Sequence, residues 1–375
     1  MNRPLDGIIV ADFTHVMAGP YCTKYLVESG ARVIKIERPV LGDDGRHYGP
    51  YDGKNSLYFH TYNHSKESVV LDLKNPDDHK IASNIIAKAD ILVENFRPGV
   101  MKKINFDYDA LKSNNPKLIY TSICGYGQTG CMAHLPAYDL IIQAATGLMS
   151  VTGEADGPPI KVGPSIADLI AGLYAFTAIN TALYHRTRTG KGTHIDIAMF
   201  DCLLTLLGVT CLTQTALNIT PTRIGNHHSD ITPFGIFNCK DTHIIICAGT
   251  DALFRQTCEV LNISKLADDP KMATNELRAQ NRDYMNHAFN QALSKNTAKH
   301  WHEKFDNTGI PSGLVNSIKE ALKMPNLKDR DIMIQAGKYT MVGNPMKFSD
   351  IEMPKKYATA PTLGQHTNQI RKEFS

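Results

Sequence analysis

The strongest constraint on the fold is a strand–helix–strand pattern at the N-terminus. Gly7 to Phe13 and Ala31 to Glu37 (GIIVADF and ARVIKIE) are short runs rich in β-branched residues, which is typical of buried strands. Between them, residues 18–29 form a helical segment, and Gly30 follows at the place where a helix commonly ends. Two strands joined by a crossover helix form a parallel βαβ unit. We therefore expect a parallel sheet.

Further strand candidates continue this alternation along the chain. Helix-like segments such as residues 77–88 separate them. The candidates lie at residues 68–73, 91–94, 118–123 and 194–198. Strands that alternate with helices predict an α/β fold with a doubly wound, mostly parallel, Rossmann-like sheet and helices on both faces.

A change in composition marks a second domain. The chain has 375 residues, which is enough for two domains. An apolar helix is expected at residues 202–217, and residues 222–241 are rich in turn formers and histidine before a strand at 243–248. We expect a large domain at residues 1–205 and 325–375, a small α/β domain at 225–310, and linkers at 206–224 and 311–324.

Composition excludes several classes of function. A net charge of +3 with dispersed Lys and Arg predicts no nucleic-acid partner. The eight cysteines contain no CxxC pair and the histidines no HExxH motif, so we expect reduced thiols and no metal. The first apolar run is short and flanked by Asp6 and Asp12, unlike a secretion signal, and no apolar run reaches the roughly 18 residues of a membrane helix. We expect a soluble, cytoplasmic protein with no membrane partner.

The loops after the strands are the first places to look for a ligand. Parallel sheets bind ligands at the carboxyl ends of their strands. The loop Thr14 to Pro20 lacks GxGxxG, which disfavours a nicotinamide dinucleotide. Arg38 follows the second strand and could bind a phosphate, although a solvated surface arginine is the commoner case. Several further cations follow the third and fourth strands and could neutralise a phosphorylated small molecule: Lys74, Arg97, Lys102 and Lys103.

One carboxylate, Asp168, begins a mostly apolar stretch in VGPSIADLIAGLYA. Ser165 stands three residues before it, so the pair predicts a capping box in which each side chain accepts the other residue's backbone N–H. Taken alone, this window favours a helix cap over a reactive group. A catalytic role for Asp168 needs support from the rest of the chain.

Ten segments together resemble one known family, the class III coenzyme A transferases, which include formyl-CoA and crotonobetainyl-CoA transferases and the α-methylacyl-CoA racemases. Among the matching segments are DFTHVMAGPYCTKYLVESGARVIKIERP, ILVENFRPGVM, PAYDLIIQAATGLMSVTGE, VGPSIADLIAGLYA and APTLGQHT. The resemblance runs from Gly7 to about Thr367. It implies a two-domain fold in which two chains form an interlocked homodimer, with coenzyme A (CoA) on the large domain.

The resemblance also assigns residues. The family's nucleophilic aspartate falls on Asp168, whose carboxylate would attack an acyl-CoA thioester, form an anhydride and then an aspartyl-CoA thioester, and pass CoA to a carboxylic acid. CoA is then a substrate, and no permanently bound cofactor is expected. The implied CoA contacts are His15, Met17, Ala18, Arg38, Leu71, Asp72, Leu73, Lys74, Asn95, Phe96, Arg97, Lys103, Ala137 and Tyr138.

Departures from the family pattern bear on the reaction. Many members have glutamine where this chain has Met17, and residues 247–256 (CAGTDALFRQ) lack the glycine run of formyl-CoA transferases, which counts against the formyl/oxalate pair. Racemases need a histidine where this chain has Tyr138, before Asp139, so transfer is favoured over α-proton exchange. The alternatives are an acyl-CoA racemase or isomerase, and a CoA-binding protein without transferase activity.

Overall fold

The centre of the fold is a six-stranded sheet in which every neighbouring pair of strands is parallel. The computed structural model describes residues 3–375. The strand order is β5-β2-β1-β6-β7-β8. The strands are β1 (Ile9–Asp12), β2 (Arg32–Glu37), β5 (Glu67–Val70), β6 (Ile91–Glu94), β7 (Ile119–Cys124) and β8 (Thr193–Ala198). The predicted parallel α/β sheet is confirmed.

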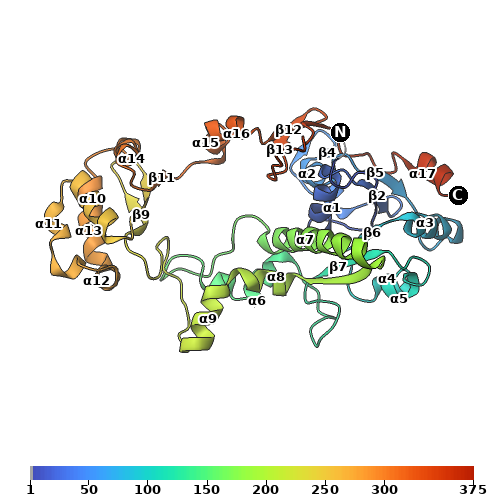
Figure 1. The fold of residues 1–375 in the computed structure, drawn as a ribbon, viewed down its shortest axis with the longest axis horizontal. Coiled ribbons are helices and arrows are strands. Elements are labelled where there is room, and N and C mark those ends of the chain that lie inside the picture. The colour runs from blue at the N-terminus through green and yellow to red at the C-terminus, as the bar shows by residue number, and fades with distance from the viewer. Residues whose placement is uncertain (1–2) are drawn as a thin grey trace. The chain divides into compact units, whose positions relative to one another are not determined.

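Alternate side chains of the strands enter two separate cores, one on each face of the sheet. Val10 of β1 belongs to one core, which includes residues of α1 (Ala18–Glu28) and α7 (Ile166–Thr189). Ala11 belongs to the other, which includes residues of α3 (Pro76–Lys88) and α17 (Thr367–Glu373). Helices therefore cover both faces, as a doubly wound sheet requires (Figure 1).

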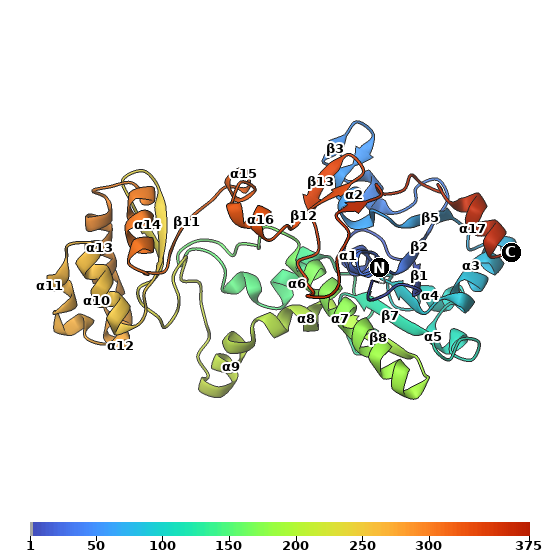
Figure 2. The same ribbon diagram turned by 45° about the horizontal axis from the view of Figure 1, so that its top comes forward.

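The C-terminal segment closes the β5 edge of the sheet. The backbone of His366 donates to Ser68 O at 2.9 Å, and Val70 N donates to Thr367 Oγ1 at 3.0 Å. In both ribbon views α17 lies beside α3 (Figures 1 and 2). These bonds satisfy backbone groups that an exposed edge strand would leave open to another chain.

The chain divides into two compact units. Unit 1 comprises residues 1–149, 161–219 and 326–375, and unit 2 comprises residues 150–160 and 220–325. Residues 150–160 group with unit 2, whereas the sequence pattern places them in the large domain. The core of unit 2 lies between the sheet β11-β10-β9 and the surrounding helices, with Phe237, Ile244 and Phe289 fully or almost fully buried.

The remaining elements are short. In unit 1 they are η1 (Asp44–His47), β3 (Tyr51–Asp52), β4 (Asn55–Ser56), α2 (Leu57–Asn63), α4 (Val100–Lys103), α5 (Tyr108–Leu111), α6 (Asp139–Ala145), α8 (Met199–Leu206), α9 (Gly208–Leu217), β12 (Met333–Ala336), β13 (Tyr339–Val342) and β14 (Lys356–Tyr357). In unit 2 they are β9 (Phe234–Asn238), β10 (His243–Cys247), α10 (Asp251–Val260), α11 (Ser264–Ala267), η3 (Pro270–Met272), α12 (Asn275–Gln280), α13 (Arg282–Leu293), α14 (Ala298–Asn307), β11 (Ser312–Leu314) and α15 (Ile318–Ala321). Two more lie next to the unit boundaries, η2 (Leu148–Ser150) and α16 (Pro325–Asp329).

Two expectations about apolar helices were wrong. The single helix expected at 202–217 is two helices, α8 and α9, which meet at Leu207 with a bend of 77°. We also expected no apolar segment of membrane length, but α7 is long and apolar enough by length and composition to cross a membrane. A core helix has the same composition, and α7 buries Ala167, Ala171 and Ile179 in the first core.

Small residues let α7 approach the start of α1 closely. A Cβ atom at position 172 would lie 2.6 Å from the backbone oxygen of Ala18, and one at position 19 would lie 2.3 Å from Thr14 Cγ2. Both distances are too short for real carbon contacts, so glycine at 172 and 19 permits this packing. The first turn of α7 is therefore held beside the loop that follows β1.

Candidate active site

A cavity of about 280 Å³ opens at the carboxyl ends of β1, β6, β7 and β8. Its walls combine residues that are far apart in the sequence, and all of them belong to unit 1. Nine of the residues predicted for the site line it, namely His15, Met17, Ala18, Asn95, Phe96, Arg97, Ala137, Tyr138 and Asp168. The sheet thus brings the predicted nucleophile together with eight of the predicted CoA contacts.

Sequence reasoning missed the other half of the wall, which is mostly apolar. These residues are Val16, Pro98, Val100, Ile123, Cys124, Gly125, Ala133, Leu135 and Met199. Apolar side chains carry no chemical signal in a sequence, and only their position at the strand ends could have indicated them.

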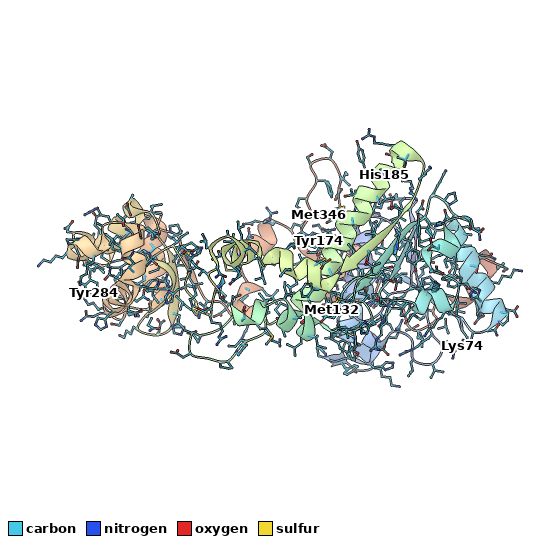
Figure 3. All side chains as sticks on the ribbon, turned by 90° about the horizontal axis from the view of Figure 1, so that it is seen from below. Lys74, Met132, Tyr174, His185, Tyr284 and Met346 are labelled. Carbon is cyan, nitrogen blue, oxygen red and sulfur yellow. The ribbon has the colours of Figure 1, made fainter. Side chains whose placement is uncertain are left out.

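The remaining six predicted contacts lie outside this cavity. Arg38 follows β2, which lies next to β1, and residues 71–74 follow β5, the edge strand beyond β2, whereas Lys103 ends α4. The side chain of Leu71 is buried in the second core, so only its backbone can face a ligand. Lys74 is exposed and lies at the outer surface (Figure 3). The candidate contacts thus follow the strands from β7 to β5 along the carboxyl edge of the sheet.

The β1–α1 loop and the β6 loop are tied together by hydrogen bonds. The backbone N–H of His15 donates to Asn95 Oδ1 at 2.8 Å, and Asn95 Nδ2 donates to His15 O at 2.9 Å. The rings of His15 and Phe96 stack with centroids 5.4 Å apart. These contacts fix two walls of the cavity relative to each other.

Arg38 is already paired with an acid. Its guanidinium donates to Asp44, and His15 Nδ1 lies 3.7 Å from the other oxygen of the same carboxylate. Burial lowers the pKa of His15, although Asp43 and Asp44 oppose that change. A phosphate that reached Arg38 would share this cation with Asp44.

The capping box predicted for Asp168 is wrong. Ser165 is the N-cap residue of α7, but its side chain accepts no capping hydrogen bond. Instead, Asp139 Oδ1 accepts the N–H of Ala167 at 2.7 Å, and Asp139 Oδ2 accepts from Gln143 Nε2 at 2.7 Å. A carboxylate from α6 therefore caps α7, which leaves the Asp168 carboxylate available to the cavity.

The surroundings of Asp168 favour its protonated form. Burial, and then the negative charge of Asp139, raise the pKa of Asp168 to about 7. Burial, neighbouring tyrosines and the charge of Asp168 likewise raise the pKa values of Tyr58 and Tyr62. A weakly solvated carboxylate is a stronger nucleophile than one in water, so the burial that raises the pKa of Asp168 also makes its ionised form more reactive.

No metal centre is visible in the part of the chain that the structure describes. Among residues 3–375 there is no group of three or more His, Cys, Asp or Glu side chains that could hold a metal ion. The eight cysteines are all free thiols.

Comparison with known proteins identifies the family to which the chain belongs. Residues 5–367 match the family model described as CoA-transferase family III. The chain is 45% identical over 373 residues to acetyl-CoA:oxalate CoA-transferase of Acetobacter aceti, covering 99% of this chain and 96% of that protein. It is 37% identical over 382 residues to succinyl-CoA:glutarate CoA-transferase of Mus musculus, covering 99% and 86%.

A solved structure extends the similarity to the fold. The crystal structure of a CAIB/BAIF family protein from Brucella suis superimposes with a TM-score of 0.91 at 35% identity, and the match covers 100% of each chain. The family match and the relatives span almost the whole chain. The chain therefore belongs to CoA-transferase family III and is an acyl-CoA:carboxylate CoA-transferase.

Proposed function

We propose that Asp168 is the nucleophile of the CoA transfer. The observation that carries this proposal is its position, because Asp168 is the one carboxylate among the residues lining the cavity. Its carboxylate attacks the thioester carbonyl, and the C–S bond breaks. CoA departs as its thiolate, and a mixed anhydride between Asp168 and the acyl group remains. The thiolate then attacks the aspartyl carbonyl and releases the first acid, leaving an aspartyl-CoA thioester. An acceptor carboxylate reverses these steps, takes CoA and regenerates Asp168.

The apolar wall protects these intermediates. Anhydrides and thioesters hydrolyse if water reaches them, and Ile123, Leu135 and Met199 leave water few polar partners in the cavity. The route requires no group beyond Asp168 and the two substrates, so we propose that CoA acts as substrate with no resident cofactor. The racemase alternative is disfavoured by Tyr138, which supplies no imidazole for proton exchange.

We propose that the CoA moiety lies along the carboxyl edge of the sheet. The thioester end enters the cavity beside Asp168, and the phosphates extend toward Arg38 and Lys74 across the ends of β1, β2 and β5. In support, these strands are adjacent and parallel, and cations follow two of them. Arg97 and Lys103, which follow β6, supply further positive charge for the three phosphate groups of CoA.

We further propose that the acceptor is a short dicarboxylate. The two transferases compared above are named for oxalate and glutarate, both dicarboxylates. An apolar Met17 at the cavity wall suits a donor with a small apolar acyl group, such as acetyl-CoA.

An acceptor panel tests the substrate proposal. With acetyl-CoA and succinyl-CoA as donors, at least one of oxalate, succinate and glutarate should give a kcat/KM at least about tenfold above those of acetate and propionate, because a site built for a second carboxylate rejects acids without it. Mass spectrometry of the CoA thioesters formed measures each rate, with acetate paired with succinyl-CoA and succinate with acetyl-CoA so that every product differs in mass from its donor. A preference for monocarboxylates would exclude a dicarboxylate acceptor.

Replacing the nucleophile tests the mechanism. Asp168→Asn should lower kcat by at least about 10³-fold while CoA affinity changes little, because the amide keeps the shape but cannot attack. Asp283→Asn is the matched control, since Asp283 is exposed in the first turn of α13 and should be dispensable. Hydroxylamine added with acyl-CoA should convert Asp168 to its hydroxamate, seen as a peptide mass shift. Near-normal turnover of Asp168→Asn would refute the assignment.

The pH dependence tests the raised pKa. The pKa of Asp168 is about 7, so the reactive carboxylate is lost below neutral pH and kcat/KM for acyl-CoA should rise through about pH 7. Asp139→Asn removes the like charge and should move this midpoint to lower pH. Burial also raises the pKa of Glu94 to about 7. The charge of Asp139 acts on Asp168, so a shifted midpoint in Asp139→Asn identifies Asp168 as the titrating group. An unchanged midpoint in that variant would contradict titration of Asp168.

We also propose that the enzyme is a homodimer. The helices α7, α8 and α9 expose apolar side chains, and Figure 3 labels Tyr174 on α7. These residues are Leu173, Tyr174, Tyr184, Leu206, Val209, Leu212 and Leu217. A second copy of the chain would remove this surface from water.

Sedimentation should show a dimer at micromolar concentration, and the double variant Val209→Asp with Leu212→Asp should weaken the dimer. A monomeric wild type would exclude the proposal.

A further inference from the structure

A fully buried ion pair lies directly behind the β1–α1 loop. Lys35 of β2 and Asp43 have almost no exposed side-chain surface, and Lys35 Nζ lies 2.9 Å from Asp43 Oδ2. The same ammonium donates to Thr14 O at 2.6 Å. The pair therefore connects the segment after β2 to the first residue of the loop.

The second oxygen of Asp43 holds the loop at its most strained position. Asp43 Oδ1 accepts the N–H of Val16 at 2.8 Å and that of Gly45 at 2.8 Å. Val16 has a φ of 65°, in the left-handed region that a β-branched residue rarely adopts. Another interaction must compensate for the free-energy cost of this conformation. The hydrogen bond from the Val16 N–H to Asp43 supplies such an interaction, because it is made by the strained residue itself.

Side chains hold the whole loop in this way. The N–H of Thr14 donates to Asp12 Oδ1 at 2.9 Å, that of His15 to Asn95 Oδ1, and that of Val16 to Asp43. Three consecutive amides are thus bound by side-chain oxygens from three different parts of the chain. These three hydrogen bonds define the conformation of residues 14–16 of the loop.

The conformation of the β1–α1 loop determines which of its groups face the cavity. His15, Val16 and Met17 all line it, and Met17 is the N-cap residue of α1. If Val16 returned to an ordinary negative φ, the peptide planes on both sides would rotate. The residues before and after it would then leave their present positions.

We propose that Lys35 and Asp43 are positioning residues for acyl-CoA: the buried pair holds Val16 in the left-handed conformation and so keeps the β1–α1 loop in the shape that receives the thioester. This inference rests on the proposed location of CoA in the cavity. Neither residue lines the cavity itself. Asp43 acts through Val16, and Lys35 acts through Asp43 and Thr14.

The charges of the pair persist at neutral pH. Burial by itself would raise the pKa of Asp43, but Lys35 and the N–H of Val16 hold it below its ordinary value. Burial would lower the pKa of Lys35, but Asp43, Asp12 and Glu37 raise it instead. The pair is therefore a permanent anchor and does not switch with pH.

A double-mutant cycle with Val16 tests the role of Asp43. Asp43→Ala should raise the Kd for CoA and the KM for acyl-CoA by about tenfold or more, with a much smaller change in kcat. Glycine adopts the left-handed conformation without a side-chain penalty, so in a Val16→Gly background the same substitution should cost no more than about threefold. An equal cost in both backgrounds would overturn the proposal, because the effect of Asp43 would then not pass through Val16.

Two controls separate the possible failures. Glu28→Gln disrupts another buried pair, Lys24–Glu28, and should lower the melting temperature without changing the Kd for CoA. Arg97→Ala should weaken CoA binding if the cavity is the CoA site. If Arg97→Ala has no effect, the proposed CoA site is wrong, whatever the role of the Lys35–Asp43 pair. If Asp43→Ala does not fold because it leaves the Lys35 charge buried and unpaired, the double variant Lys35→Met with Asp43→Ala replaces it in the same cycle, since it removes both charges and the bond to Val16, with the same outcomes deciding.

Discussion

The close contact between α7 and α1 is the constraint on which the site depends. Gly172 lets α7 approach Ala18 O to a distance that no Cβ atom would permit, and Gly19 does the same for α1 against Thr14. Asp168 lies one turn before Gly172, so this packing places its carboxylate beside the β1–α1 loop. The apolar contacts of the first core then hold the helix pair together.

Buried charge is the second organising feature of unit 1. Asp12 on β1 is directly opposite Lys35 on β2 in the parallel register, and Asp12 Oδ2 lies 3.1 Å from Lys66 Nζ. Burial lowers the pKa of Lys66 to about 8, although Asp12 opposes that change. Removing so many charges from water is costly unless each has a partner, and here each contact also orients a backbone group. The polar network therefore supports the loop that the apolar cores leave uncovered.

The site combines a carboxyl group with a raised pKa, Asp168, and a mostly apolar cavity wall. Asp139 has two roles in this arrangement, because it caps α7 through Ala167 and raises the pKa of Asp168 through its charge. The same carboxylate thus both positions the proposed nucleophile and tunes it. Transfer of CoA between carboxylates suits such a site, since the thioester energy is kept only when hydrolysis is slow.

The sequence by itself determined the class of fold and the family, because β-branched runs alternating with helical segments leave few arrangements other than a parallel sheet, and motifs spread over the whole chain match one family. It also indicated Asp168 and the loops after the strands. Only the tertiary structure decided which of those residues meet in one cavity, that Asp139 caps α7 where Ser165 had been expected to, and that α8 and α9 are separate helices. The reason is physical: strand and helix patterns are local, whereas the cap on α7 and the cavity wall join residues that lie tens of positions or more apart, and their partners are selected by packing.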